Sequence, residues 1–465
     1  VERSRGLGDV YKRQGVHIAH QDSTPMVLIV GDVARNVKDR EAFQEVDFKS
    51  FFGPISKWVA EVNDPDRVPE YMNRAFSLAT SGRPGPVVIV TPEDMLTQMS
   101  KVKLPPLSPV LRGEMPSNGV KSLKDSLKNS KKPLFIIGGS GWSDVACSKF
   151  HKFINENNIP VATSFRRQDL FDHKNENFAG SFGTSVSPKL IDSTKNSDLI
   201  IVLGARLGEM TTQGYSIISP QDISKNIMHI HVDPNELNKV FNANVCINVG
   251  VNECCDKLEE LTLDNSDRWK EWRNELNKNY LEDSKPQKNR NINNLSKIFG
   301  IVEKKFPTNS IITLDAGNNA AWPQRFLSFG RNRRQIASTC GSMGYAIPAA
   351  VSSALSNPEK AVLCCVGDGG FMMSSQEIST AVHYGAKIII LLINNSSYAT
   401  IRMHQERDYP GRKIATDLKN PDFVKLCKAM GADAYRVKGV EDFSQIFAKS
   451  LKSKKVNVIE IPISI

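Results

Sequence analysis

The sequence has no run of eighteen apolar residues and no pattern typical of a signal peptide. A membrane-spanning helix needs about 20 predominantly apolar residues, so we expect no membrane association and, by default, a cytoplasmic protein. None of the eight cysteines stands in a CxxC motif, and two pairs are adjacent in sequence, a spacing that rarely suits a disulfide. Reduced thiols in a cytosolic setting fit this usage best.

The positive charge also lacks the features of a nucleic-acid-binding module. The formal net charge is +10, and lysines gather near residues 131, 285 and 449 without interleaved aromatic side chains. We interpret these clusters as solvated faces, and a mild general attraction for anionic ligands is compatible with them. We therefore expect no nucleic-acid partner.

Short apolar runs followed by glycine, alternating with helical segments, are the main pattern that is present. In the first part of the chain, "PMVLIVGD" (25–32) and "GPVVIVTP" (85–92) bracket a helical segment at 66–82. This alternation predicts parallel βαβ units. The same pattern recurs after a proline-rich stretch at 101–118 and again from about residue 291.

We therefore expect an α/β fold with three consecutive doubly wound parallel sheets. At 465 residues the chain has room for about two to four domains. Residues 1–14 are basic, lack an apolar period and look like a leader foreign to the fold. The expected domains are 15–98, 119–262 and 291–465.

The stretch "VLCCVGDGGFMM" (362–373) joins a buried strand to a lone carboxylate, Asp368, among glycines. Ser374 and Glu377 have the spacing of a capping box and predict the start of a helix, which Gly385 can end. The apolar run "KIIILLI" then predicts a second buried strand, which stops at two asparagines. A right-handed crossover would bring both strand ends to the same edge of the sheet.

The residues expected at that edge predict a binding site for a metal-bound phosphate group. Asp368 supplies a carboxylate oxygen and Asn395 an amide oxygen, which Mg²⁺ prefers, and the metal commonly keeps phosphate oxygens as further ligands. Glycines 367, 369 and 370 let the backbone approach a bulky anion. The alternative is a plain turn with Asp368 as a helix N-cap. Two asparagines at the end of an apolar strand favour the ligand hypothesis, because they are costly unless they bond something.

The GDG motif followed by NN about two dozen residues later resembles the motif of thiamine-diphosphate enzymes. Four further segments are similar to the acetolactate synthase family: "ASTCGSMGYAIPAAVSSAL" (337–355), "AFQEVD" (42–47), "ATSGRPGPVVIVTPED" (79–94) and "VLGARLGE" (202–209). The resemblance covers residues 15–465. It implies that the three domains are the remainder of a pyrimidine-binding domain, a central Rossmann-like domain and a diphosphate-binding domain.

The resemblance implies specific cofactor contacts. Asp368, Asn395 and the backbone oxygen of Ser397 match the Mg²⁺ ligands. Met343 matches the bulky residue under the thiazolium ring, with a core methionine as the alternative. The full set of matching cofactor positions is Gly317, Asn318, Asn319, Gly341, Ser342, Met343, Gly367, Asp368, Gly369, Gly370, Asn395, Ser397, Tyr398, Ala399 and Thr400.

The implied activity is decarboxylation of a small 2-oxo acid followed by its joining to a second carbonyl compound, as in branched-chain amino acid biosynthesis. Phe43 and Gln44 match a pair that reaches the active site from the first domain, and Gln44 is the catalytic candidate. A surface position is the alternative for Gln44. The resemblance also implies a homodimer or homotetramer with the active site at the subunit interface. A simple 2-oxo acid decarboxylase or another lyase stays open, as does a non-catalytic pseudoenzyme or regulatory subunit.

The sequence departs from the family in several places. No glutamate matches the residue that activates the cofactor's aminopyrimidine ring, so we expect an N-terminally truncated form of a longer enzyme. "IIGGSGWSD" and "GARLGE" are similar to a domain that holds FAD in some relatives, and a tight packing turn is the alternative. His404 is a candidate pocket residue, with a solvent-facing position as the alternative.

Overall fold

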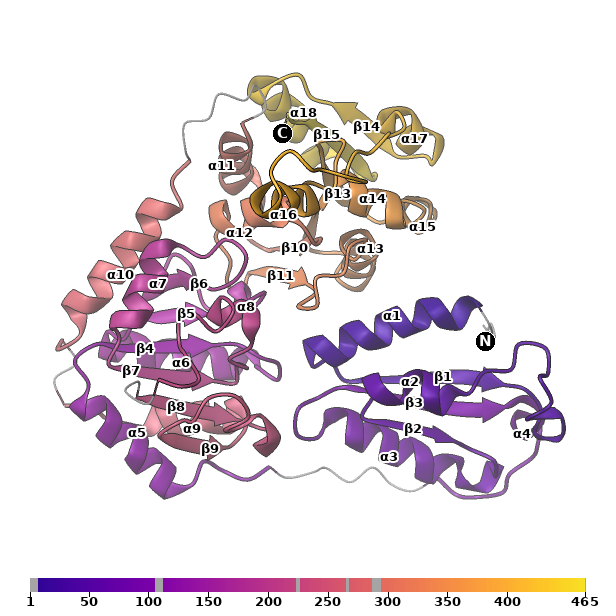
Figure 1. Ribbon diagram of the computed structural model, residues 1–465, viewed down its shortest axis with the longest axis horizontal. Coiled ribbons are helices and arrows are strands. Elements are labelled where there is room, and N and C mark those ends of the chain that lie inside the picture. Colours follow the sequence, from indigo (N-terminus) through magenta and orange to yellow (C-terminus); the bar gives the residue numbers. More distant parts are fainter. Residues whose placement is uncertain (1–6, 105–111, 223–225, 265–266, 287–293, 465) are drawn as a thin grey trace.

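The computed structural model describes residues 7–104, 112–222, 226–264, 267–286 and 294–464 (Figure 1). Within these residues the strands form three sheets, and every strand pair in them is parallel. Each sheet is built from one contiguous stretch of chain and carries helices on its faces (Figure 1). The predicted fold class is therefore confirmed.

The first sheet has three strands, with β3 in the middle. In spatial order they are β1 (Met26–Asp32), β3 (Pro86–Pro92) and β2 (Trp58–Glu61). The side chains of β3 alternate, so Val87 and Ile89 face one core while Val88 and Val90 face the other. Helix α3 (Val68–Thr80) lies against the first core, and α1 (Leu7–Asp22) and α2 (Phe48–Phe52) lie on the second. A short helix, α4 (Glu93–Leu96), follows β3.

The first unit agrees with the elements expected from the sequence only in part. Residues 1–6 of the expected leader lie outside the described residues, and the boundary expected at residue 14 falls inside α1. The expected helix at 66–82 is present as α3. Strand β2 was not predicted, because its apolar run is only three residues long and is followed by no glycine.

The middle sheet has six strands. In spatial order they are β6 (Phe178–Ser181), β5 (Val161–Thr163), β4 (Pro133–Ile137), β7 (Leu199–Leu203), β8 (Ile227–His231) and β9 (Val245–Asn248). Its helices are α5 (Ser117–Asn129), α6 (Asp144–Asn157), α7 (Pro188–Asn196), α8 (Glu209–Thr212), α9 (Val251–Glu260) and α10 (Lys270–Asp283). This alternation of strands and helices is the pattern expected after the proline-rich stretch at 101–118.

The third sheet also has six strands. In spatial order they are β11 (Arg333–Ala337), β10 (Ser310–Leu314), β12 (Ala361–Gly367), β13 (Ile388–Asn394), β15 (Asn457–Pro462) and β14 (Asp433–Arg436). Its helices are α11 (Leu295–Lys305), α12 (Ala321–Phe326), α13 (Ala346–Ser356), α14 (Asp368–Ser374), α15 (Glu377–His383), α16 (Ala399–Asp408), α17 (Phe423–Ala429) and α18 (Val440–Lys452).

Both faces of the third sheet are buried, which explains the continuous apolar runs of its central strands. On β12, Val362, Cys364 and Val366 face the core under α13, α15 and α17. Leu363 and Cys365 face the opposite core, under α11 and α18. Burying each large aliphatic side chain contributes about 1.5–3 kcal/mol, so the two cores together fix the register of the strands that carry the site.

The helix start predicted at Ser374 is wrong. Helix α14 begins six residues earlier, at Asp368, and ends at Ser374, whose side chain caps nothing. Helix α15 then starts at Glu377 without a side-chain cap on its N-cap residue. Its predicted end is confirmed, because Gly385 has φ +64° and Ala386 N–H closes the helix on the carbonyl of Ala381 at 2.8 Å.

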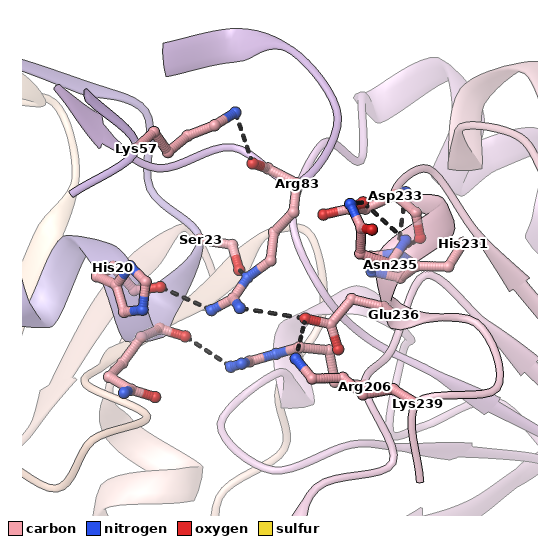
Figure 2. A network of polar contacts seen from close by, with 11 residues as sticks. His20, Ser23, Lys57, Arg83, Arg206, His231, Asp233, Asn235, Glu236 and Lys239 are labelled. Atoms are coloured by element: carbon pink, nitrogen blue, oxygen red, sulfur yellow. Dashed lines mark hydrogen bonds and ion pairs between the residues drawn. The ribbon is translucent and has the colours of Figure 1, made fainter. Parts of the chain in front are cut away.

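A polar network ties the first unit to the middle unit, as Figure 2 shows. Arg83 donates to Ser23 Oγ at 2.8 Å and to Glu236 Oε1 at 3.2 Å. Arg206 of the middle unit donates in turn to the carbonyl of Gln21 at the end of α1, at 2.7 Å. These largely buried charges are hydrogen-bonded, as buried ionic groups must be, and they hold α1 against the middle sheet.

The third unit contacts both of the others. Asp22, at the end of α1, accepts from Thr339 N at 2.7 Å. Arg334 Nε pairs with the buried Asp169 of the middle unit at 2.6 Å, and the side-chain amide of Gln335 donates to that of Gln168 at 2.9 Å. Among the residues that the structure describes, no helix is both long and apolar enough to cross a membrane.

Candidate functional site

A cavity of about 260 Å³ opens at the carboxyl edge of the third sheet, where open parallel sheets bind ligands. All its lining residues belong to the third unit, and they lie at or after the ends of β10, β11, β12, β13 and β15. Trp322, Ile401 and Ile463 give it an apolar wall. Among the described residues that line it, none is a lysine, arginine or histidine.

Two of the predicted metal ligands stand side by side at this edge. Gly367 at the end of β12 is in register with Ile393 of β13, so Asp368 and Asn395 follow neighbouring strand ends. Asn395 Oδ1 accepts from the backbone N–H of Ser397 at 3.1 Å. The third predicted ligand, Ser397, is held by its own hydroxyl, which donates to the carbonyl of Thr416 at 2.9 Å. One carboxylate, one amide and one backbone carbonyl are thus gathered around the cavity.

Asp368 is the acid of this edge, and its surroundings are unusual for a charged group. It is only 2% exposed, and this burial raises the pKa of its carboxyl group. A hydrogen bond from the side chain of Asn420, at 2.7 Å, acts in the opposite direction. Such a buried acid with a single side-chain donor is typical of functional sites.

A second acid, Asp315, lies beneath the cavity and was not among the predicted site residues. It is 1% exposed, which raises the pKa of its carboxyl group. Its oxygens accept from the backbone N–H groups of Ala316 at 2.8 Å, Gly344 at 3.1 Å and Ala346 at 3.1 Å. Asp315 therefore fastens the loop that carries Met343 to the end of β10. Its place at a strand end in "TLDAG" is the signal by which the sequence could have revealed it.

The glycine positions leave a cradle for a bulky anion. Gly317 has φ +111°, and a Cβ atom there would stand 3.0 Å from the side chain of Asn319. The Asn319 amide lies between the carbonyl of Ala316 at 3.0 Å and the N–H of Gly367 at 3.2 Å, so it braces one loop against the other. The neighbouring Asn318 donates its backbone N–H to Thr400 Oγ1 at 3.0 Å.

Tyr398 and Met343 close over the first turn of α14. A Cβ atom on Gly369 would meet the Tyr398 ring at 2.7 Å and the methyl group of Met343 at 3.2 Å. Met343 is 36% exposed and lines the cavity, so its surroundings differ from those of a core methionine. The predicted residues Gly341, Gly370 and Ala399 line the same cavity.

Four predicted residues are not brought to the cavity within one chain. Ser342 turns its hydroxyl to the thiol of Cys340, 3.0 Å away, and His404 is exposed on α16. Gln44 has φ +68° in a surface loop of the first unit, next to Phe43, which is 87% exposed. No lining residue comes from that unit.

The glycine-rich turn of the middle unit packs tightly against the next strand. A Cβ atom on Gly138 would lie 1.9 Å from Ser164 Oγ, and one on Gly139 would lie 1.9 Å from the carbonyl oxygen of Gly204. Close packing accounts for these glycines. A tight packing turn was the alternative to FAD binding in the sequence analysis. A larger cavity of about 390 Å³ lies nearby, and two of its charged lining residues, Arg206 and Glu236, bond the first unit.

Comparison with known proteins gives two family matches. Residues 315–461 match the C-terminal TPP binding domain of thiamine pyrophosphate enzymes, and residues 120–258 match the central domain of the same enzymes. The first match contains the whole cavity apart from Ile463.

Curated relatives agree over most of the chain. The acetolactate synthase large subunit of Buchnera aphidicola subsp. Acyrthosiphon pisum is 30% identical over 92% of this chain and 76% of its own length. The protein of the same name from Buchnera aphidicola subsp. Schizaphis graminum is 29% identical over 96% and 80%. The acetolactate synthase isozyme 3 large subunit of Escherichia coli K12 is 26% identical over 97% and 81%. The chain is a thiamine-diphosphate-dependent enzyme that belongs to the family of acetolactate synthase large subunits.

Proposed function

We propose that the cavity of the third unit holds the diphosphate of thiamine diphosphate together with Mg²⁺, and that Asp368, Asn395 and the Ser397 carbonyl are the metal ligands. The observation that carries this proposal is the charge of the lining: an acid is present, while the described lining residues include no cationic side chain. A diphosphate and a carboxylate repel each other, by about 1 kcal/mol at 4 Å in water and more inside a protein. A divalent cation between them reverses the sign of that interaction, and its preferred oxygen ligands are those present.

The remaining residues would position the cofactor. When bound, thiamine diphosphate supplies the carbon nucleophile and the electron sink that loss of CO₂ from a 2-oxo acid requires. Asn319 and Thr400 hold the loop of Gly317 beside the diphosphate, and Asp315 holds the loop that presents Met343 to the ring. Trp322 and Ile401 give the cavity an apolar wall against which the cofactor or a small substrate could pack.

We further propose that the reaction joins the decarboxylated 2-oxo acid to a second carbonyl compound, as the name acetolactate synthase of the relatives indicates. The full-length enzyme is purified and incubated with pyruvate, thiamine diphosphate and Mg²⁺, and the products are analysed. Acetoin after acidification is the expected result. CO₂ and acetaldehyde alone would instead assign a simple decarboxylase, and cofactor binding without either product would assign a non-catalytic role.

We also propose that the functional unit contains at least two copies of the chain. Within one chain no first-unit residue lines the cavity, whereas Phe43 and Gln44 stand on an exposed loop. Three non-glycine residues of this loop, Asp39, Glu41 and Gln44, have positive φ, a conformation that costs about 1–3 kcal/mol each and clusters at functional sites. A second copy could bring this loop to the cavity. Light scattering should give the mass of a dimer or tetramer, and a monomer at every concentration would contradict the proposal.

A further inference from the structure

The segment between α16 and α17 pairs with the loop that follows β13 and carries Asn395 and Ser397, two of the proposed metal ligands. Ser397 and Asp417 form an antiparallel bridge, Tyr398 N–H donates to Thr416 O at 2.9 Å, and Leu418 N–H donates to Ser396 O at 2.9 Å. This pairing fixes the position of the residues that follow Leu418 relative to the ends of the strands. Asn420 therefore lies over the ends of β12 and β13.

The side chain of Asn420 uses both of its amide hydrogens at this edge. Its Nδ2 donates to Asp368 Oδ2 at 2.7 Å and to Asn394 Oδ1 at 3.0 Å. The N-cap of α17 is supplied by another residue, Asp422, whose carboxylate accepts from Lys425 N. Pro421 disfavours the helical conformation for the residue before it, which keeps Asn420 in the extended segment. The Asn420 amide is thus not needed to start α17.

The orientation of the Asn420 amide is fixed by a chain of hydrogen bonds that begins at Glu460. This residue of β15 is 2% exposed, and its Oε2 accepts from Arg436 Nε at 2.8 Å. An ionised carboxylate only accepts, so the nitrogen of Asn394 must face Glu460 Oε1, at 2.8 Å. The oxygen of Asn394 then faces Asn420, which must present its nitrogen.

We propose that Asn420 is a positioning residue that holds the Asp368 carboxylate in the orientation needed to bind the divalent cation of the cofactor. The hydrogen bond occupies Oδ2 and, with the backbone N–H groups of Gly369 and Ser396, restrains rotation of the carboxylate about its last bond, so that the other oxygen keeps one direction. The inference rests on the proposed function, because it requires a cation at Asp368. Groups that orient a metal ligand typically change metal affinity by about 10- to 100-fold when they are removed.

The test measures Mn²⁺ binding by electron paramagnetic resonance in the presence of saturating thiamine diphosphate. We expect Asn420→Ala to weaken Mn²⁺ binding by about 10- to 100-fold. Asn420→His should restore much of the affinity, because imidazole Nδ1 stands the same number of bonds from Cα as the amide nitrogen. Lys419→Ala is the matched control: its exposed side chain precedes Asn420 in the same segment, and the substitution should leave Mn²⁺ binding unchanged.

A merely structural role for Asn420 would give a different pattern. It would lower the melting temperature of the protein without metal or cofactor, whereas we expect a change below about 2–4 °C. Unchanged Mn²⁺ affinity in Asn420→Ala, or an equal loss in Asn420→His, overturns the inference while leaving the proposed function standing. Failure of the unsubstituted protein to bind Mn²⁺ and thiamine diphosphate overturns both.

Discussion

Replacing Asp368 by alanine is expected to abolish the Mg²⁺-dependent binding of thiamine diphosphate. Among the described residues that line the cavity, Asp368 is the one carboxylate. None of them is a lysine, arginine or histidine that could neutralise the diphosphate instead of a metal ion. Without Asp368, the Asn395 side chain and the Ser397 carbonyl offer only neutral oxygen ligands to Mg²⁺. We expect the dissociation constant of the cofactor, measured by calorimetric titration with Mg²⁺, to rise roughly a thousandfold, which corresponds to about 4 kcal/mol.

Two further variants separate the loss of a ligand from damage to the fold. Asp368→Asn keeps the shape of the side chain and an oxygen that accepts from Asn420, but removes the charge, and it should lose most of the affinity too. Neither change should unfold the protein, because burial disfavours the ionised form of this carboxylate. Asp125→Ala, on the exposed face of α5, is the control with unchanged binding. Unaltered affinity in Asp368→Ala would remove the metal site from this edge.

The central part of this site could be predicted from the sequence for a simple geometric reason. A buried strand ending at Asp368 and another ending at Asn394–Asn395 must share one edge if they are parallel, and the structure has β12 and β13 as direct neighbours. Continuous apolar runs on both strands also predicted burial on both faces, which the two cores around the third sheet confirm. Local pattern and tertiary structure agree here because the two strands are joined by a single crossover and pair directly with each other.

The sequence predicted poorly what depends on contacts between distant segments. Asn420 is 52 residues from its partner Asp368, and no periodicity relates the two. Ser374 and Glu377 had the spacing of a capping box, yet packing of the first turn of α14 against Asp315 and Tyr398 starts the helix at Asp368 instead. The network around Arg83 joins the first unit to the middle unit. The sequence around its side chains does not differ from that of ordinary charged surface segments, so the network could not be predicted.

Replacing Gly370 by alanine is expected to destabilise the third unit and to weaken cofactor binding together. A Cβ atom at this position would stand 2.6 Å from Asp315 Oδ1 and 3.0 Å from its Cγ. Asp315 cannot move away easily, because three backbone N–H groups hold its carboxylate. Overpacking of this kind costs about 1–3 kcal/mol, and the better helix propensity of alanine returns at most about 1 kcal/mol.

The same substitution at Gly300 is the matched control, and it should have the opposite sign. Gly300 lies within α11, where a Cβ atom would make only an ordinary contact, 3.5 Å from Pro286 Cγ. Gly300→Ala should therefore stabilise the protein by about 0.5–1 kcal/mol in urea unfolding. The shift of Asp315 in Gly370→Ala would also displace the loops of Gly317 and Met343, so the affinity for thiamine diphosphate should fall with the stability. If Gly370→Ala were as stable as Gly300→Ala, Asp315 would have to be free to turn, and its role in fastening both loops would be wrong.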